Sequence, residues 1–180
     1  MALRIIDFAD LTEVQYAEAA DVLRDAFAHV PDAFDGAFDE EVASFITDEK
    51  RAGLAALDGD QVIGWIGVIR TYEHGWETHP LAVDPHRQGR GVGSDLVAAL
   101  EARVRALGVL TLYLGTDDDF GGTSLYGADL FPNVAQKIAT MQPTGGHPFT
   151  FYQRLGYEVV GLLPDVNGLG RPDILMAKRL

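Results

Sequence analysis

The chain has 180 residues, 47 % of them apolar, which suits a single globular domain over residues 1–180 with a full hydrophobic core. It contains no cysteine, so disulfides, thiolate metal sites and a cysteine nucleophile are excluded. The formal net charge is −13, and residues 1–60 alone hold 15 acidic and 4 basic residues, which argues against a nucleic-acid partner. This charge either attracts a cationic ligand or only gives a solvated, soluble surface.

The first half of the chain alternates between strand and helix patterns. Period-two and apolar runs predict strands, and apolar residues at helical spacing predict helices. The predicted strands are Leu3–Phe8, Ala52–Leu57, Val62–Thr71 and Trp76–Val83. The predicted helices are Thr12–His29, Asp39–Asp48 and Ser94–Leu107. We expect the first helix to bury a stripe that includes Val14 and to end near Pro31, a loop at Asp32–Phe38, and a second helix with Phe45 and Ile46 facing inward.

The second half has one segment that breaks this rhythm. After a predicted apolar strand at Leu110–Gly115, residues 117–146 form a connection that is longer than usual. Such a segment either lines a site or is disordered, and only Val134–Met141 has a helical pattern. A helix at His147–Leu155 and two strands complete the chain. These strands are Tyr157–Leu163 and Asp173–Ala177.

The resulting order predicts a mixed α/β sheet with helices on both faces. The sequence has no apolar run that approaches the length of a membrane span. Its N-terminus lacks the basic region and apolar core of a signal peptide. We therefore expect a cytoplasmic protein that does not bind membranes.

A glycine-rich loop, Gln88-Gly89-Arg90-Gly91-Val92-Gly93, joins a predicted strand to a predicted helix. Glycines let the backbone approach an anion closely, and the N–H groups that open a helix point toward it. The loop lacks the lysine of a Walker motif, and Ser94 stands where a dinucleotide-binding fingerprint needs its third glycine. The pattern favours a pyrophosphate cradle, and the alternative is a plain strand-to-helix connector.

The spacing Gln/Arg-x-x-Gly-x-Gly in this loop resembles the acyl-CoA loop of the GNAT N-acetyltransferases. The order of strands and helices is also similar to theirs, so the resemblance covers essentially the whole chain. It implies the GNAT fold, with a mostly antiparallel sheet of six to seven strands, and acetyl-CoA as cosubstrate. It implies that the strand backbone before the loop pairs with the pantetheine amides and polarises the thioester carbonyl. The implied cosubstrate-binding residues are Leu81, Ala82, Val83, Gln88, Gly89, Arg90, Gly91, Val92, Gly93 and Ser94.

A second GNAT-like segment runs from Phe151 to Tyr157 and places Tyr152 four residues before the glycine that closes the last helix. The resemblance implies that Tyr152 protonates the departing CoA thiolate, a role that suits the weakly acidic phenol. The alternative is a tyrosine that only packs. We expect the neighbouring Tyr157 to pack at the start of the next strand.

Glu77 is our candidate for the group that takes the proton from the attacking amine, directly or through water. The alternative is a solvent-exposed glutamate at the start of a strand. His79 lies on the same strand face by period-two counting and assists as a base, orients Glu77 or is a structural histidine. No set of ligands at standard metal spacing surrounds the histidines, so we expect no metal. Without a cysteine, direct attack in a ternary complex is the expected mechanism.

Several segments resemble one GNAT branch, the aminoglycoside 6'-N-acetyltransferase-like proteins. Polycationic acceptors need carboxylates around the site. Asp117 and Asp118 follow a strand and are candidate substrate-binding residues, together with Trp76, His79 and Tyr126. The aspartate run is otherwise a solvated loop, and Trp76 and Tyr126 otherwise only pack. The acceptor could instead be a polyamine, an amino acid or a peptide N-terminus, and a non-catalytic acyl-CoA-binding regulator is a further alternative. The family resemblance also suggests a homodimer.

Overall fold

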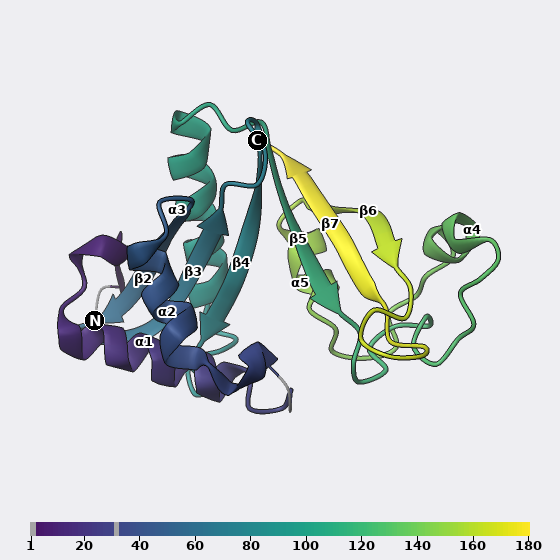
Figure 1. Cartoon of the computed structure of the whole chain (residues 1–180), viewed down its shortest axis with the longest axis horizontal. Coiled ribbons are helices and arrows are strands. Elements are labelled where there is room, and N and C mark those ends of the chain that lie inside the picture. Colours follow the sequence, from purple (N-terminus) through teal and green to yellow (C-terminus); the bar gives the residue numbers. More distant parts are fainter. Residues whose placement is uncertain (1–2, 31–32) are drawn as a thin grey trace. The chain divides into compact units, whose positions relative to one another are not determined.

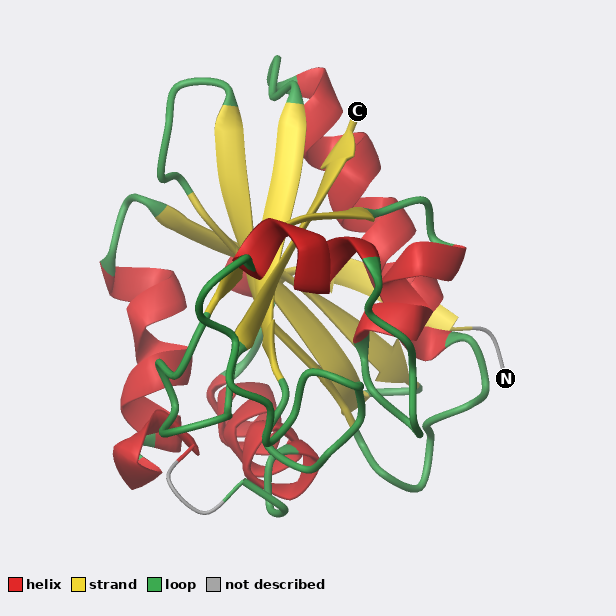
Figure 2. Ribbon diagram, turned by 90° about the vertical axis from the view of Figure 1, so that its right-hand side faces the viewer, coloured by secondary structure: helices red, strands yellow, loops and turns green. Residues whose placement is uncertain are grey.

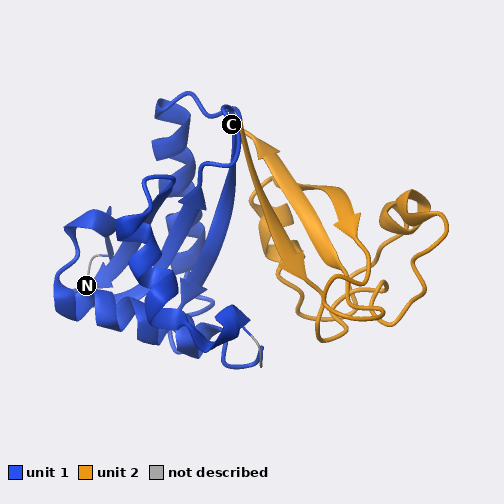
Figure 3. Ribbon diagram, viewed as in Figure 1, with its two compact units in different colours: residues 1–110 blue, residues 111–180 orange. Residues whose placement is uncertain are grey.

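The computed structural model describes residues 3–30 and 33–180. The chain divides into two compact units, residues 1–110 and residues 111–180 (Figure 3). The prediction that the whole chain forms one domain stays a prediction. Within the described residues, no helix is long and apolar enough to cross a membrane.

Unit 1 is built on four antiparallel strands in the order β1-β2-β3-β4 (Figure 1). The strands are β1 (Leu3–Asp7), β2 (Arg51–Asp58), β3 (Gln61–Ile69) and β4 (Gly75–Val83). The turn at residues 59–60 joins β2 to β3 as a hairpin, and the positive φ of Gly59, +67°, suits this tight turn. Between Ile66 and Val68 the pairing of β3 with β4 shifts, so three residue steps of β4 lie opposite two of β3. This bulge falls at residues 79–80, directly before the strand segment that leads into the glycine loop.

Helices cover both faces of this sheet, as predicted. Helices α1 (Glu13–Ala26) and α2 (Phe38–Thr47) lie on one face, where Trp65 Nε1 donates to Ala19 O at 3.0 Å and the Trp65 ring meets the Phe45 ring at 5.3 Å. Helix α3 (Val92–Ala106) lies on the other face, because a Cβ on Gly64 would come within 3.3 Å of Val92. Successive residues of a strand point to opposite faces of the sheet. Gly64 faces α3 and Trp65 faces α1 and α2, so the two helical layers lie on opposite faces.

Two residues predicted to face the core do not. Val14 is 69 % exposed and Ile46 is 53 % exposed. Helix α1 instead buries a stripe that starts at Gln15, whose Oε1 accepts from Thr12 N and whose Nε2 donates to Asp60 O at 2.9 Å. This capping box sets the rotation of the helix and turns Val14 outward. Helix α1 ends at Ala26, with Phe27 as its C-cap, and so stops short of the predicted His29. Pro31, near which the end was predicted, and Asp32, the first residue of the predicted loop, lie outside the described residues. The rest of that loop contains a short 3₁₀ turn at Ala33–Gly36, and its last residue, Phe38, begins α2.

Unit 2 contains three antiparallel strands in the order β5-β7-β6. The strands are β5 (Thr111–Asp117), β6 (Glu158–Leu163) and β7 (Asp173–Arg179). Its helices are short, α4 (Val134–Ala139) and α5 (Phe149–Arg154). The remainder of residues 118–148 is loop, drawn in green in Figure 2. The predicted helix over His147–Leu155 is thus shorter than expected, and His147 and Pro148 precede it.

Candidate active site

The glycine loop between β4 and α3 begins as a closed turn around Asp84. The carbonyl of Asp84 accepts from Arg87 N at 2.8 Å and Gln88 N at 3.1 Å, and its side chain accepts from His86 N at 2.8 Å. The side chain of Gln88 donates to Val83 O at 3.1 Å. The first part of the loop is therefore fixed by its own hydrogen bonds, before the glycines begin.

The second part of the loop has the shape of an anion cradle. Gly89 and Gly91 have φ of +72° and +91°, which favour glycine, and space is open where a Cβ would stand at either. The first backbone hydrogen bond at the start of α3 runs from Asp95 N to Gly91 O, at 3.0 Å. The N–H groups of Val92, Gly93 and Ser94 precede this bond and are the free donors of the helix start. Such donors, together with the helix dipole, suit a pyrophosphate.

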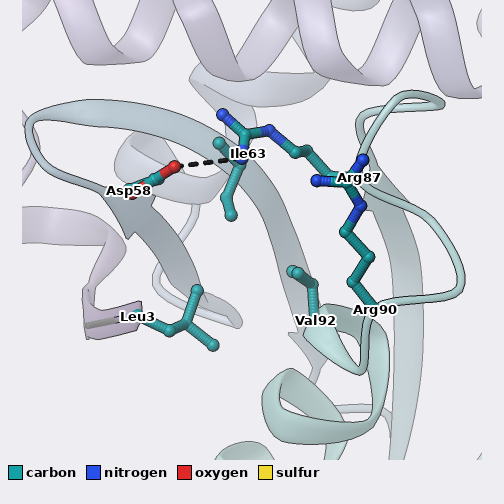
Figure 4. A pocket seen from close by; sticks show the side chains of 6 residues that line it. All are labelled: Leu3, Asp58, Ile63, Arg87, Arg90 and Val92. Carbon is teal, nitrogen blue, oxygen red and sulfur yellow. Dashed lines mark ion pairs between the residues drawn. The ribbon is translucent and has the colours of Figure 1, made fainter. Parts of the chain in front are cut away.

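An open pocket of about 300 Å³ adjoins this loop (Figure 4). Its lining residues come from three strands and the loop; they are Leu3, Asp58, Ile63, Arg87, Arg90 and Val92. Arg87 Nη1 reaches Asp58 Oδ2 at 3.0 Å, and this ion pair joins the loop to the end of β2. Two arginines beside the free N–H groups add positive charge where the whole protein is acidic.

The strand segment before the loop is well anchored. Leu81, Ala82 and Val83 pair with Ile66, Trp65 and Gly64 of β3, respectively. Ala82 is fully buried. This segment therefore has a fixed position relative to the glycine loop in unit 1, as a backbone that pairs with a cosubstrate requires.

Glu77 and His79 follow one another at alternate positions of β4 and are both half-buried, whereas Trp76 and Thr78 are buried. The alternation supports the prediction that Glu77 and His79 share a strand face. The ring of His79 lies 5.7 Å from the Phe34 ring, and its Nε2 lies 3.5 Å from Oε1 of Glu41. Trp76 packs under the Arg70 guanidinium at 5.0 Å.

Glu41 on α2 is a neighbour of His79 that no motif or spacing in the sequence indicated. Its Oε1 also accepts from Arg51 Nη1 at 2.7 Å. Burial raises the pKa of the Glu41 carboxyl, but the hydrogen bond from His79 and the charge of Arg51 outweigh it and hold this pKa below its ordinary value. Glu41 is thus an ionised carboxylate that orients His79.

Tyr152 on α5 is buried among aromatic rings. Its ring makes edge contacts with Phe151 at 5.0 Å and with Tyr157 at 5.5 Å. Tyr157 packs as expected, with only 2 % of its surface exposed. Burial raises the pKa of the Tyr152 phenol above its ordinary value of 10.0, so the phenol keeps its proton at neutral pH.

The acidic run after β5 divides into different environments. Asp117 is exposed and accepts from Asn167 Nδ2 at 2.5 Å. Asp118 is fully buried, and Asp119 is paired with Arg171 at 2.7 Å. Tyr126 is exposed and packs its ring near Gly121. Among the described residues, no group of three or more His, Cys, Asp or Glu side chains is placed to hold a metal ion.

Residues 16–126, more than half of the chain, match the model of the acetyltransferase (GNAT) family. The chain belongs to the GNAT family. A curated relative, the N-alpha-acetyltransferase RimI of Mycobacterium tuberculosis, is 30 % identical over 123 residues, which are 67 % of this chain and 74 % of that protein.

Two GNAT crystal structures match nearly the whole chain. An aminoglycoside 6'-N-acetyltransferase complexed with coenzyme A is 39 % identical, with a TM-score of 0.90, and the match covers 98 % of this chain and 96 % of that one. The aminoglycoside 6'-N-acetyltransferase from Enterococcus faecium is 38 % identical, with a TM-score of 0.87, and the match covers 99 % and 97 %. The seven strands with helices on both faces of the unit 1 sheet are therefore those of the predicted GNAT fold.

Membership in the GNAT family makes the protein an acetyl-CoA-dependent N-acetyltransferase. The glycine loop fits this cosubstrate, since its free N–H groups and open space over Gly89 and Gly91 suit the pyrophosphate of a coenzyme A. The sequence identified this GNAT loop from its glycine spacing. The sequence analysis did not single out two residues beside this loop, Arg87 and Asp58. The basic character of the loop could have indicated Arg87, whereas nothing in the sequence indicated Asp58. The predicted homodimer and cytoplasmic location stay predictions.

Proposed function

We propose that this GNAT enzyme acetylates a primary amine of a small polycation, with the 6'-amine of an aminoglycoside as the acceptor. The observation that carries the proposal is the likeness, over nearly the whole chain, to two aminoglycoside 6'-N-acetyltransferases at 39 % and 38 % identity. The charge of the chain agrees with it, because residues 1–60 hold 15 acidic and 4 basic residues and attract a polycation.

In the proposed reaction the amine nitrogen attacks the thioester carbonyl directly, forming the C–N bond as the C–S bond breaks. Glu77 accepts the proton that the ammonium must lose, directly or through one water. A backbone N–H of the Leu81–Val83 segment donates to the oxygen on which charge develops. Tyr152 gives its proton to the departing thiolate. The phenol is protonated at neutral pH, and the second proton, which the acylated nitrogen releases, returns to it through water. The products are the amide, the free thiol and a protonated Glu77.

The acceptor contacts follow from exposure. Asp117 is exposed and carries the charge that we assign to the polycation, and exposed Tyr126 and half-buried His79 supply the other proposed contacts. Trp76, which the sequence also suggested, is buried beneath the Arg70 guanidinium, and we leave it out. Asp118, which the sequence also suggested, is fully buried, and three donors occupy its carboxylate. We therefore assign Asp118 to the loop and leave it out of the proposed acceptor contacts.

A thiol-release assay with acetyl-CoA tests the acceptor. We expect turnover with kanamycin and none with a matched aminoglycoside that carries a hydroxyl in place of the 6'-amine. Spermidine and a short peptide with an N-terminal alanine serve as the other acceptors. Turnover of the peptide or of spermidine without turnover of kanamycin would overturn the aminoglycoside proposal.

The N-terminal amine of a peptide is the second candidate acceptor. It is favoured by the likeness to the N-alpha-acetyltransferase RimI, at 30 % identity over 123 residues. That match covers less of the chain than the aminoglycoside enzymes do, and it therefore ranks second. The same assay separates the two candidates, because the peptide and kanamycin present different amines to one enzyme.

A further inference from the structure

The long connection of unit 2 closes on itself at its base. We call residues 121–124 and 142–145 the neck. Across it, Ser124 N donates to Gln142 O at 2.9 Å and Thr144 N donates to Gly122 O at 3.0 Å, while Thr123 and Pro143 form a β-bridge. The neck therefore holds the ends of residues 125–141 together, and it is an ordered part of unit 2.

Asp118 fastens the neck to the end of β5. Its Oδ1 accepts from Gly122 N at 2.8 Å, and its Oδ2 accepts from Thr123 N at 2.9 Å and from Thr123 Oγ1 at 2.6 Å. Its own N–H donates to Pro172 O at 2.9 Å. A fully buried carboxylate with three donors is satisfied and fixed.

His147 links the same end of β5 to helix α5. Its Nδ1 accepts from Phe149 N at 3.1 Å, so its Nε2 carries the proton and donates to Asp117 O at 3.0 Å. Its carbonyl accepts from both Thr150 N at 3.2 Å and Thr150 Oγ1 at 3.0 Å. One residue thus joins a strand end to the first turn of a helix through four hydrogen bonds.

The His147 side chain has no room to move toward the neck. A Cβ added to Gly122 would come within 2.6 Å of the His147 Cβ, so glycine is needed there for the close approach. On its other side the imidazole meets the Phe149 ring at 5.4 Å. Asp118, Gly122 and His147 therefore form one packed unit between the neck and α5.

Helix α5 depends on this unit for its start. It has six residues, and the residue that precedes it, Pro148, provides no side-chain cap. The donor of Phe149 is met by the His147 ring and that of Thr150 by the His147 carbonyl. Tyr152 follows within the same turn, and its N–H donates to Pro148 O at 3.2 Å. The direction in which α5 presents Tyr152 is therefore set by residues at its first turn.

We propose that His147 is a positioning residue for the acetyl transfer, which holds α5 so that the Tyr152 hydroxyl is in place to protonate the leaving thiolate. The proposal rests on the acid role proposed above for Tyr152. It also gives the long connection a function, because the neck is the support against which His147 is packed.

The protonation state of His147 agrees with this arrangement. Burial lowers its pKa, and the carboxylates of Asp118, Asp117 and Asp119 oppose that effect without outweighing it. Asp119 is itself paired with Arg171. The imidazole is therefore neutral near pH 7, and Nδ1 stays available as the acceptor for Phe149 N.

A double-mutant cycle tests the proposal, with kcat and the KM for acetyl-CoA measured on each variant. The variants are His147→Phe, which loses both ring hydrogen bonds, His147→Asn, whose amide oxygen stands near the place of Nδ1, Tyr152→Phe and the two doubles. We expect His147→Phe to lower kcat about tenfold and to change KM less than twofold. His147→Asn should recover most of kcat. Adding either change to Tyr152→Phe should cost less than twofold more.

The outcomes are distinguishable. If the effects of His147→Phe and Tyr152→Phe multiply, His147 does not act through Tyr152 and the proposal fails. If His147→Asn loses as much kcat as His147→Phe does, the hydrogen bond to Phe149 N is not what matters, and the proposal fails again. If Tyr152→Phe alone leaves kcat unchanged, the acid role of Tyr152 fails instead. His74→Asn, in the exposed turn before β4, is the matched control and should leave kcat unchanged. Should His147→Phe not fold, His147→Gln replaces it in the cycle, because its amide nitrogen can stand near the place of Nε2 while it lacks an acceptor at the place of Nδ1.

Discussion

Arg87 on the glycine loop and Asp58 at the end of β2 form an ion pair, with 3.0 Å between Nη1 and Oδ2. The side chains are 34 % and 19 % exposed, so solvent screens the pair only in part. The pair anchors the loop at a residue directly before the Gln88–Gly93 motif. Arg87 thus contributes both an anchor and a positive charge beside the loop that we propose holds the cosubstrate pyrophosphate.

Arg87→Gln removes the anchor and the charge together, and both losses weaken the hold on acetyl-CoA. We expect the KM for acetyl-CoA to rise about fivefold, which is about 1 kcal/mol, with kcat nearly unchanged. Steady-state kinetics with a fixed amine measure this. Arg105→Gln, in the last turn of α3 and exposed, removes an equal charge elsewhere and should leave KM as it is. An unchanged KM in Arg87→Gln would contradict the anchoring role.

Gly91 and Gly108 stand at the two ends of helix α3 and make a matched pair. Both have positive φ, +91° and +84°, and both have open space where a Cβ would stand. Alanine at either position should therefore cost a similar stability, about 1 kcal/mol. Gly91→Ala alone should raise the KM for acetyl-CoA, because its Cβ would occupy the space above the free N–H groups. Equal KM values in the two variants would argue against a cradle at Gly91.

The spacing of residues along the sequence predicted the helices, strands and glycine loop better than it predicted the tertiary contacts of individual side chains. The period of two in β4 and the position of the Gln88–Gly93 loop between a strand and a helix depend on neighbours in sequence, and the structure confirms both. The buried face of α1 was not, because Val14 is turned outward by a capping box whose Gln15 reaches the distant Asp60. Helix phase was decided there by a tertiary hydrogen bond, which periodicity does not contain.

The candidate site shows the same division. The spacing of Tyr152 to a glycine indicated it as a candidate. The residue that we propose positions it, His147, is held by a hydrogen bond to Asp117, which lies 30 positions away in sequence. In the sequence, Asp118 stands in a run of three aspartates, which is typical of a solvated loop or of a site for a cation. Its complete burial follows from Gly122 and Thr123 folding back onto it, and composition does not indicate this.

Asp118→Asn should destabilise unit 2. The amide NH2 would replace an oxygen that accepts from the Gly122 or Thr123 donors, leaving buried donors without an acceptor. We expect the free energy of unfolding to fall by about 2 kcal/mol, measured in urea. Residues 125–141 should also become a preferred site of limited proteolysis. Asp129→Asn, which alters an exposed aspartate whose side chain accepts from Phe131 N, should change neither result. Equal stability of the two variants would show that Asp118 does not hold the neck.

The lowered pKa of His147 makes stability depend on pH in a defined direction. Because the folded state disfavours the protonated imidazole, the unfolded chain takes up a proton first as pH falls below the ordinary value of 6.5. The contribution of the neutral His147 to stability is therefore fully present above pH 6.5 and is lost as pH falls toward the lower pKa of the folded state.

His147→Asn keeps an acceptor for Phe149 N but does not titrate, so its free energy of unfolding should fall less steeply than that of the native protein between about pH 8 and about pH 5. The nearby carboxylates of Asp117, Asp118 and Asp119 are the same in both proteins, as is Arg171, so their titration largely cancels in the difference. Urea unfolding at several pH values measures both curves, with His74→Asn as the control for loss of an exposed histidine. Parallel curves for the native protein and His147→Asn would mean that His147 does not need to be neutral in the folded state.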